Sequence, residues 1–389
     1  NMITRTAHTE GLEGNLEGQY GNYDHTKING AVNIPMGDQF AMRLAGLWLE
    51  RDGYTENLFP GADDVDGREQ YSLRASFNWS GENTTVDLMV SYFDEDSTRT
   101  RSQKTLCLND PTGLLGCQPD GLDFDMPNPS SQLSNILASD NPAILGPLGI
   151  FEFGSNERGF NPRDVREVYS EREPVYEADE TLVTLNIQHQ LDKHTLALVA
   201  GYQDTSVDSQ MDYQWSVGDP VEIPELAQIV APENYAELFY DGRLPISAPS
   251  KNSTGVIGGN IDSRPNSLEA YDQSNQSSEQ YSVELRLQSD YEGAFNFLVG
   301  GFYMKVDLDN QYWVFANGFD YLAAIAPAAG GADGLGWVAP QNNNTTDDYA
   351  IESSALFGEI YFANTETLKL TVGGRYTIDE KSIKDRQFL

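Results

Sequence analysis

Residues 69–93 read EQYSLRASFNWSGENTTVDLMVSYF, two segments of alternating apolar and polar residues joined by a short turn. The apolar positions are Tyr71, Leu73, Ala75, Phe77, Trp79, Val86, Leu88, Val90 and Tyr92. Successive side chains of a β-strand point to opposite faces, so each segment has one apolar and one polar face. The stretch therefore predicts an antiparallel β-hairpin.

Segments of this kind recur along the whole chain, and about eleven can be distinguished. They span residues 12–21, 25–35, 39–51, 69–79, 84–93, 181–191, 194–204, 279–289, 294–306, 350–362 and 368–380. Tight turns are expected at Pro35–Asp38, Ser80–Asn83, Asp192–Lys193, Asp290–Gly293 and Asn364–Thr367. After a small connection at Asn22–Asp24, the others are long: 52–68, 94–180, 205–278 and 307–349. Short connections alternate with long ones, which is typical of an all-β, antiparallel transmembrane β-barrel of the bacterial outer membrane.

A soluble antiparallel β-sandwich shows the same alternation and is the main alternative. Three features favour the barrel. Aromatic residues gather near segment ends, as interfacial girdles do. The long connections share one end of the segments, and loops of more than about 70 residues are uncommon in compact soluble domains. The barrel interpretation requires that Val86, Leu88 and Val90 face outward and are not buried against another sheet.

The chain is strongly acidic, with a net charge of −36. Phosphates would be repelled, so nucleic-acid binding is not expected. The 20 Tyr, 17 Phe and 5 Trp argue against disorder. A solvated, halophile-like surface would also explain the charge. Much of it lies in the expected loops, however, which fits wet loops on a membrane barrel.

The chain has neither an apolar run long enough for a transmembrane helix nor a signal peptide at its start. The pattern of alternating segments is already under way at Asn1 and has not ended at Leu389. Complete single-chain bacterial barrels have an even number of strands, and an open sheet edge in lipid is not viable. We therefore expect an internal fragment of a longer protein.

The two cysteines, Cys107 and Cys117, fall within one expected loop. A disulfide between them would close a loop of about ten residues and contribute roughly 2–3 kcal/mol. It would imply an oxidising compartment such as the periplasm. Two unrelated thiols are the alternative, and zinc would need more ligands than these. Their close spacing favours the disulfide.

Two further stretches resemble TonB-dependent outer-membrane receptors. The opening NMITRT (residues 1–6), with LEGNLEGQYGNYDHTKINGAVNIPMGDQFAMRLAGLWLERDGY (12–54), resembles the junction between plug and barrel and the first barrel strands. SSALFGEIYFANTETLKLTVGGRYTIDEKS (353–382) resembles a mid-barrel hairpin in which a G-x-R-Y-T strand end recurs, here Gly374–Thr377.

The resemblance implies that residues 1–389 are the first half of a 22-stranded barrel, with 1–10 the end of the junction. Members of the family import ferric siderophores, cobalamin, haem or glycans, with energy from the TonB protein. The TonB box, plug and remaining strands are absent from this sequence. We expect outer-membrane lipid, the TonB system and a small-molecule or glycan ligand as partners, and a monomer without cofactor or enzymatic activity.

Charged residues on the polar faces of the segments are expected to point to the lumen and face the plug. They are Arg43, Arg74, Asp87, Glu284, Arg286 and Arg375.

Aromatic residues in the expected loops are candidates for ligand binding, because their rings suit stacking on sugars or aromatic siderophores. They are Tyr213, Trp215, Tyr312, Trp313 and Trp337. The alternative for Tyr312 and Trp313 is that they extend a strand above the membrane, and we consider it the stronger one.

Arg99, Arg101 and Lys104 form a basic loop cluster, either an anion contact or partners of the neighbouring carboxylates Asp94–Asp96. No metal pattern, nucleophile elbow or phosphate-binding loop occurs. When Gly67 is aligned with the glycine of an EF-hand loop, Ala62 takes the place of the first calcium ligand, and alanine cannot bind the ion. Looser calcium binding by loop carboxylates stays open. The alternatives to the importer are a passive porin-like channel and a secreted soluble β-rich adhesin or binding module.

Overall fold

The computed structural model describes residues 4–101, 162, 164–212, 270–316, 341–363 and 368–388. Within them the chain forms β-strands joined by turns and loops. The strands are β1 Glu13–Tyr20, β2 Thr26–Pro35, β3 Phe40–Arg51, β4 Glu56–Asn57, β5 Arg68–Ser80, β6 Thr84–Ser97, β7 Glu167–Val168, β8 Val175–Leu191, β9 His194–Asp212, β10 Ala270–Ser289, β11 Phe295–Ala316, β12 Gln341–Ala363 and β13 Lys369–Phe388.

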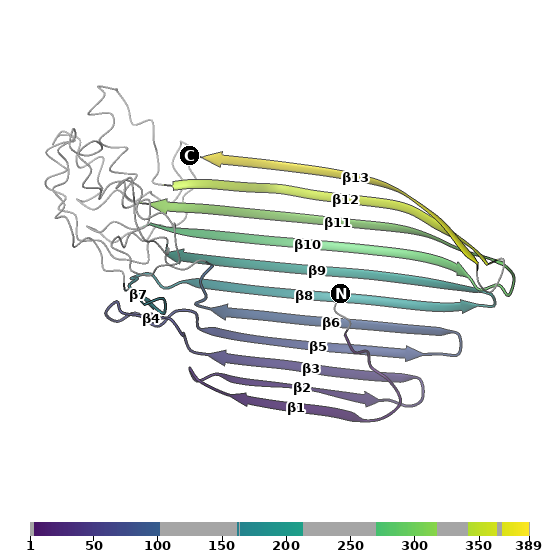
Figure 1. The fold of residues 1–389 in the computed structure, drawn as a ribbon, viewed down its shortest axis with the longest axis horizontal. Coiled ribbons are helices and arrows are strands. Elements are labelled where there is room, and N and C mark those ends of the chain that lie inside the picture. The colour runs from purple at the N-terminus through teal and green to yellow at the C-terminus, as the bar shows by residue number, and fades with distance from the viewer. Residues whose placement is uncertain are drawn as a thin grey trace, which may run out of the picture.

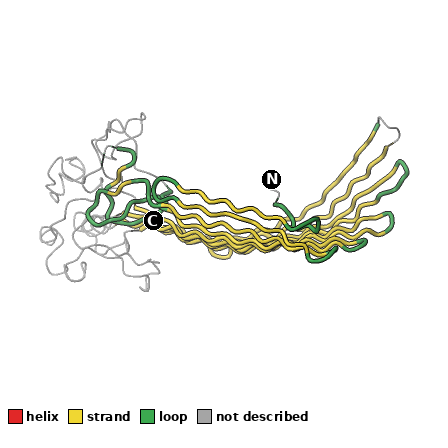
Figure 2. Tube along the Cα trace, turned by 90° about the horizontal axis from the view of Figure 1, so that it is seen from below, coloured by secondary structure: helices red, strands yellow, loops and turns green. Residues whose placement is uncertain are grey.

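Eleven of these strands form one antiparallel sheet in which every strand pairs with its neighbours along the chain (Figure 1). The order is β1-β2-β3-β5-β6-β8-β9-β10-β11-β12-β13, so that β1 and β13 are the edges. Figure 2 shows the sheet edge-on as a single layer. The two short strands β4 and β7 pair in parallel outside it. In the described part of the chain, no helix is long and apolar enough to cross a membrane.

The predicted turns at Pro35–Asp38, Ser80–Asn83, Asp192–Lys193 and Asp290–Gly293 all lie at one end of the sheet (Figure 1), and the short connection between β1 and β2 lies at the other. The predicted turn Asn364–Thr367 lies outside the described residues. The Asp192–Lys193 turn joins β8 directly to β9, and Asp192 has a φ of 44°. In the turn between β2 and β3, Gly37 has a φ of 82°. Such left-handed conformations favour Gly, Asn and Asp, which explains why these residues mark the turns.

At the opposite end, the strands are longer than the sequence pattern predicts. β9 continues from 204 to Asp212, β10 begins at Ala270 and β11 runs to Ala316. The expected loops 94–180, 205–278 and 307–349 are correspondingly too long. The added parts of β9 and β10 are mostly polar and so lack the alternation that marks the central parts, whereas the end of β11 carries Tyr312, Trp313 and Phe315. They are strands because their backbones remain in the hydrogen-bonded ladder, as between Asp204–Asp212 and Tyr271–Glu279.

One face of the sheet exposes large apolar side chains. Leu73 is 61% exposed, Leu285 48% and Leu356 71%. Val90 is also exposed, and no second sheet lies over it or over Val86 and Leu88 among the described residues. The condition set for the barrel interpretation is therefore met. We call this the apolar face, and the opposite one the polar face.

The N-terminal segment 4–12 crosses the polar face above β2–β6 (Figures 1 and 2). Asn33, fully buried on β2, holds it: its amide donates to the carbonyl oxygens of His8 (2.8 Å) and Gly11 (2.9 Å), and its oxygen accepts from the His8 N–H (3.0 Å). Farther along, the Thr4 hydroxyl lies 3.9 Å from the Met89 sulfur on β6. The segment is thus fixed to the sheet by backbone contacts that depend on one side chain.

We expect Asn33→Ala to release this segment. The change leaves the His8 N–H and two carbonyl groups without their partner, at a cost of about 1–3 kcal/mol. Trypsin cleavage after Arg5 and amide exchange of residues 4–12 should both accelerate. Asn15→Ala, at an exposed position of β1, is the matched control. Equal protection in Asn33→Ala and the control would contradict the role of Asn33.

Candidate functional site

The strand register places the six charged residues predicted to face a lumen on the polar face. Arg43 lies opposite Ser76, two residues from Arg74, and Asn78 lies opposite Asp87. The same face continues through Asn186 and Val199 to Glu284. Arg286 lies two residues from Glu284 on this face. Opposite Glu284 are, strand by strand, Phe302, Ala355 and Thr377, and Arg375 lies two residues from Thr377 on the same face. Their orientation toward a lumen and a plug stays a prediction.

Most of these residues already have partners on the sheet. Asp87 accepts a hydrogen bond of 2.8 Å from the Asn78 amide. Arg286 forms a 3.1 Å ion pair with Glu284. Arg43 lies 3.7 Å from Glu13.

Arg375 instead lies over two aromatic rings, at 5.4 Å from the ring centres of both Phe302 and Phe357. Phe357 covers Gly300 so closely that a Cβ atom there would lie 2.5 Å from the ring. Glycine at 300 therefore makes room for the ring that supports Arg375.

The apolar face ends, toward the long loops, in tyrosine pairs and then in carboxylates. The Tyr71 and Tyr92 rings lie 5.8 Å apart, and the Tyr202 and Tyr281 rings 5.2 Å apart. Above them, one residue from each of five adjacent strands forms a row of directly opposed acids: Glu50, Glu69, Asp96, Glu177 and Asp208. Like charges directly opposite each other are destabilising, so this row requires water or counterions around it. It marks a sharp boundary between an apolar and a hydrated zone.

At the same end, three segments fold against the ends of the strands. We call residues 52–67, 98–101 and 164–174 the loop-end cap. Val65 and Val168 of the cap form a buried cluster with Met211 of β9. β4 and β7 lie in the cap, where the Asn57 amide donates to the Ser170 carbonyl (2.8 Å) and its oxygen accepts from the Ser170 N–H (3.1 Å). The cap thus joins segments more than a hundred residues apart in sequence.

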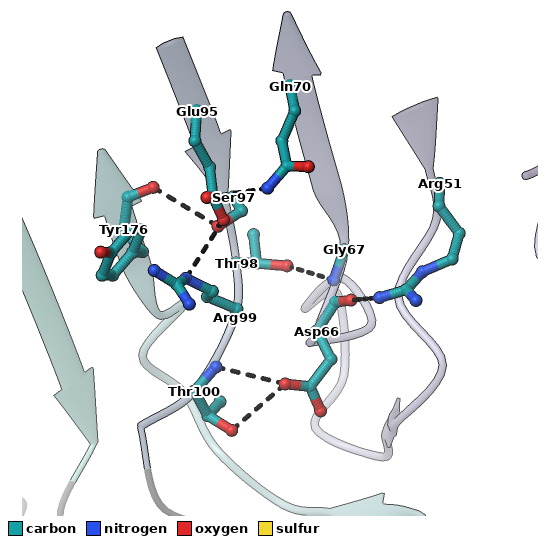
Figure 3. A network of polar contacts seen from close by, with 10 residues as sticks. All are labelled: Arg51, Asp66, Gly67, Gln70, Glu95, Ser97, Thr98, Arg99, Thr100 and Tyr176. Carbon is teal, nitrogen blue, oxygen red and sulfur yellow. Dashed lines mark hydrogen bonds and ion pairs between the residues drawn. The ribbon is translucent and has the colours of Figure 1, made fainter. Parts of the chain in front are cut away.

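Asp66 is the centre of the cap's polar network (Figure 3). Its buried carboxylate accepts hydrogen bonds from the Thr55 hydroxyl (2.7 Å) and from the Thr100 N–H and hydroxyl (both 3.2 Å). Its carbonyl oxygen accepts from Arg51 at 2.6 Å. The φ of Asp66 is 68°, a conformation that Asp tolerates better than most residues. This one residue therefore fixes both the turn and the contact between two loops.

A second part of the network surrounds Glu95, a buried residue at the end of β6 (Figure 3). Its carboxylate accepts from Gln70 (2.8 Å) and Ser97 (3.0 Å) and pairs with Arg99 (3.1 Å). The Arg99 guanidinium also lies 3.4 Å from the ring centre of Tyr176. Arg99 of the predicted basic cluster therefore pairs with a neighbouring carboxylate, which was the alternative to an anion contact. Lys104 lies outside the described residues.

Arg101 reaches across to β10, where it forms an ion pair with Asp272. Asp272 also accepts a 3.0 Å hydrogen bond from the Tyr312 hydroxyl. Burial raises the pKa of Asp272, and the Arg101 charge and the Tyr312 hydrogen bond partly oppose this rise.

Of the five predicted ligand-binding aromatics, Tyr312 and Trp313 lie in strand β11, as the strand-extension alternative expects. Trp313 is only 5% exposed. Tyr213, Trp215 and Trp337 lie outside the described residues, as do Cys107 and Cys117, so the disulfide stays a prediction.

The cap borders an open cavity of about 510 Å³ whose lining includes Glu50, Asp52, Asp63, Asp64, Glu69 and Asp96. Arg51 and Arg68 also line it. Among the described residues, no group of three or more His, Cys, Asp or Glu side chains is arranged to hold a metal ion.

The roles of Asp66 and Asn57 were not predicted from the sequence, and of the contacts of Glu95 only its pairing with the neighbouring basic cluster was. The signal available for Asp66 was the turn sequence Asp-Gly at 66–67, which favours a left-handed residue. No pattern pointed to Asn57, because its partner Ser170 is distant in sequence, or to the contact between Glu95 and Gln70, which only the strand pairing brings together.

Asp66→Ala should loosen the cap, because it removes three side-chain hydrogen bonds and leaves Thr55 and Thr100 without an acceptor. We expect a local loss of about 1–3 kcal/mol, seen as faster amide exchange at residues 52–67 and 98–101. Asp66→Asn should have a smaller effect, since Asn retains one acceptor oxygen and tolerates the positive φ. The exposed Asp63→Ala is the control. Unchanged exchange in Asp66→Ala would show that the network does not hold the cap.

Comparison with known proteins identifies the fold. No family model matches the chain, and no curated protein matches its sequence. Among solved structures, the ferric yersiniabactin uptake receptor FyuA from Yersinia pestis matches with a TM-score of 0.50 and 10% identity, over 99% of this chain and 44% of FyuA. FpvAI, in its complex with pyocin S2, matches with a TM-score of 0.51 and 10% identity, over 99% of this chain and 40% of the other.

The chain thus spans less than half the length of the two structures. At this level of identity the likeness concerns the fold. The open, eleven-stranded antiparallel sheet agrees with part of a larger barrel. The chain has the fold of about half of a TonB-dependent outer-membrane receptor barrel.

Proposed function

We propose that this chain is the first half of the barrel of a ligand-gated, TonB-energised importer in the bacterial outer membrane. The observation that carries the proposal is a single-layered sheet with an exposed apolar face, with the turns after β2, β5, β8 and β10 at one end, and with a fold similar to that of the ferric yersiniabactin uptake receptor. The ligand we favour is a ferric siderophore. Cobalamin, haem or a glycan would use the same architecture. The parent protein would act as a monomeric transporter and not as an enzyme.

The apolar face supports contact with lipid. Tyrosine pairs at its upper limit fit an aromatic girdle, because their rings are apolar and their hydroxyl groups reach water. The row of carboxylates beyond them fits the hydrated surface outside the hydrocarbon region. The tight turns would then lie on the periplasmic side and the loop-end cap on the extracellular side.

The polar face supports a solvated interior that holds other parts of the protein. Segment 4–12 already lies on it, where the sequence resemblance expects the plug junction. Arg43, Arg74, Asp87, Glu284, Arg286 and Arg375 would face the plug. Tyr213, Trp215 and Trp337 would contact the ligand at the extracellular mouth. Tyr312 and Trp313 would support that mouth from β11.

Two rivals make different predictions. A soluble β-rich adhesin needs a second layer over the apolar residues, and the eleven-stranded sheet has none among the described residues. A passive porin-like channel shares the barrel, but it would conduct small solutes without TonB.

The membrane assignment predicts opposite effects of arginine on the two faces of β10. Leu285→Arg places a charge in lipid and should destabilise the inserted barrel by about 2–4 kcal/mol if the position is near the bilayer midplane. Ser282→Arg, on the polar face of the same strand, should be tolerated. The readout is the fraction of full-length protein that remains folded in outer membranes, measured by heat-modifiable gel mobility. Equal folding of the two variants would contradict the lipid assignment.

The transport function is tested with the full-length gene in a host lacking its own siderophore receptors. We expect uptake of iron-55 from at least one ferric siderophore, abolished when TonB is deleted. Uptake that persists without TonB would favour the porin-like channel. If no ferric siderophore is taken up, the same cells are tested with labelled cobalamin, haem and glycans. Failure with every class would overturn the importer.

A further inference from the structure

A small cavity of about 200 Å³ lies between the N-terminal segment and the polar face of the sheet. Three arginines line it: Arg5 from the segment, Arg43 from β3 and Arg74 from β5, with Ala45 and Ser76. It lies toward the tight-turn end, because Arg43 is three residues from the start of β3. The cavity is therefore separate from the loop-end cap and its acidic cavity.

Little negative charge balances these three guanidinium groups. Glu13, whose side chain is 53% exposed, approaches Arg43 at 3.7 Å. Within the described chain, no carboxylate lies within 4.0 Å of Arg5 or Arg74, and the buried Nε of Arg74 has no hydrogen-bond partner. Asp87, on the same face, is bound to Asn78. Three cations thus share one cavity in a protein of net charge −36.

This arrangement is unlike that of Arg286 and Arg375 on the same face. Arg286 is neutralised by Glu284 at 3.1 Å, and Arg375 lies on two phenyl rings. Arginine cannot lose its charge in a protein, so an unpaired guanidinium in a partly enclosed site favours an anion beside it. The planar fork of donors matches the two oxygens of a carboxylate.

We propose that Arg5, Arg43 and Arg74 form an anion-binding site that takes a carboxylate group. The carboxylate comes either from an acidic side chain of the same protein or from a small polycarboxylate that reaches the polar face. In both cases the guanidinium forks of Arg43 and Arg74 hold the two oxygens, and Arg5 closes the site from above. The site does not require transport, so it stands or falls separately from the proposed importer.

The test uses the full-length gene product in detergent, with citrate as the probe at constant ionic strength. Calorimetric titration measures the affinity for citrate, and thermal unfolding without citrate is followed in low and high salt. Three variants are compared with the wild type: Arg43→Gln/Arg74→Gln, the charge-conserving Arg43→Lys/Arg74→Lys, and Arg286→Gln as the control. The control removes a guanidinium that already has a carboxylate partner.

If the site takes a free polycarboxylate, the double glutamine variant should bind citrate at least tenfold more weakly, a loss of about 1.4 kcal/mol. The lysine variant should retain part of the affinity and the control all of it. If a carboxylate of the protein occupies the site, the wild type should not bind citrate. The double glutamine variant should then unfold at a lower temperature than the control, more so in low salt, with partial rescue by lysine.

Two results would overturn the site. One is a wild type that does not bind citrate together with a double glutamine variant as stable as the control. The other is an equal loss of stability in the glutamine and lysine variants that does not depend on salt, because only packing would then have been lost.

Discussion

The hydrogen-bonded ladder of one antiparallel sheet is the interaction on which the whole structure depends. The eleven strands pair in chain order, and no second layer of the described chain packs on their apolar face. Backbone groups are therefore satisfied from strand to strand and not by a surrounding core, which is what a membrane requires of β-structure. The N-terminal segment lies on the polar face alone, whereas the loop-end cap contacts both faces beyond the tyrosine pairs, as where Ser170 bonds to Asp212.

The sequence predicts this ladder well wherever apolar and polar residues alternate. The ends of β8 and β9 at Leu191 and His194 agree with the pattern, because a two-residue turn leaves no freedom in register. The pattern fails beyond 204 and before 279, where the residues are mostly polar and cross-strand pairing maintains the strands. The positions of Arg43 and Glu284 in the alternating pattern correctly predict that both lie on the polar face of the sheet. The partners of Asp66 and Asn57 could not be predicted, since Thr100 and Ser170 approach them only in the folded chain.

The distribution of charge follows the same division. On the apolar side, opposed carboxylates from Glu50 to Asp208 are confined to the zone beyond the tyrosine pairs. On the polar side, arginines gather both in the cap and beneath the N-terminal segment. In the cap they form ion pairs with Glu95 and Asp272 or lie over aromatic rings. Beneath the segment only Arg43 lies near a carboxylate, that of Glu13 at 3.7 Å, so the two ends of the polar face differ in their electrostatic character.

The two edges of the sheet have very different lengths, because β1 has 8 residues and β13 has 20. Suppose that two copies of the chain joined through β1 of one and β13 of the other. The shorter strand would leave more than half of the longer edge without backbone partners. Closure by self-association is thus geometrically mismatched, and a strand able to complete β13 has to be of similar length.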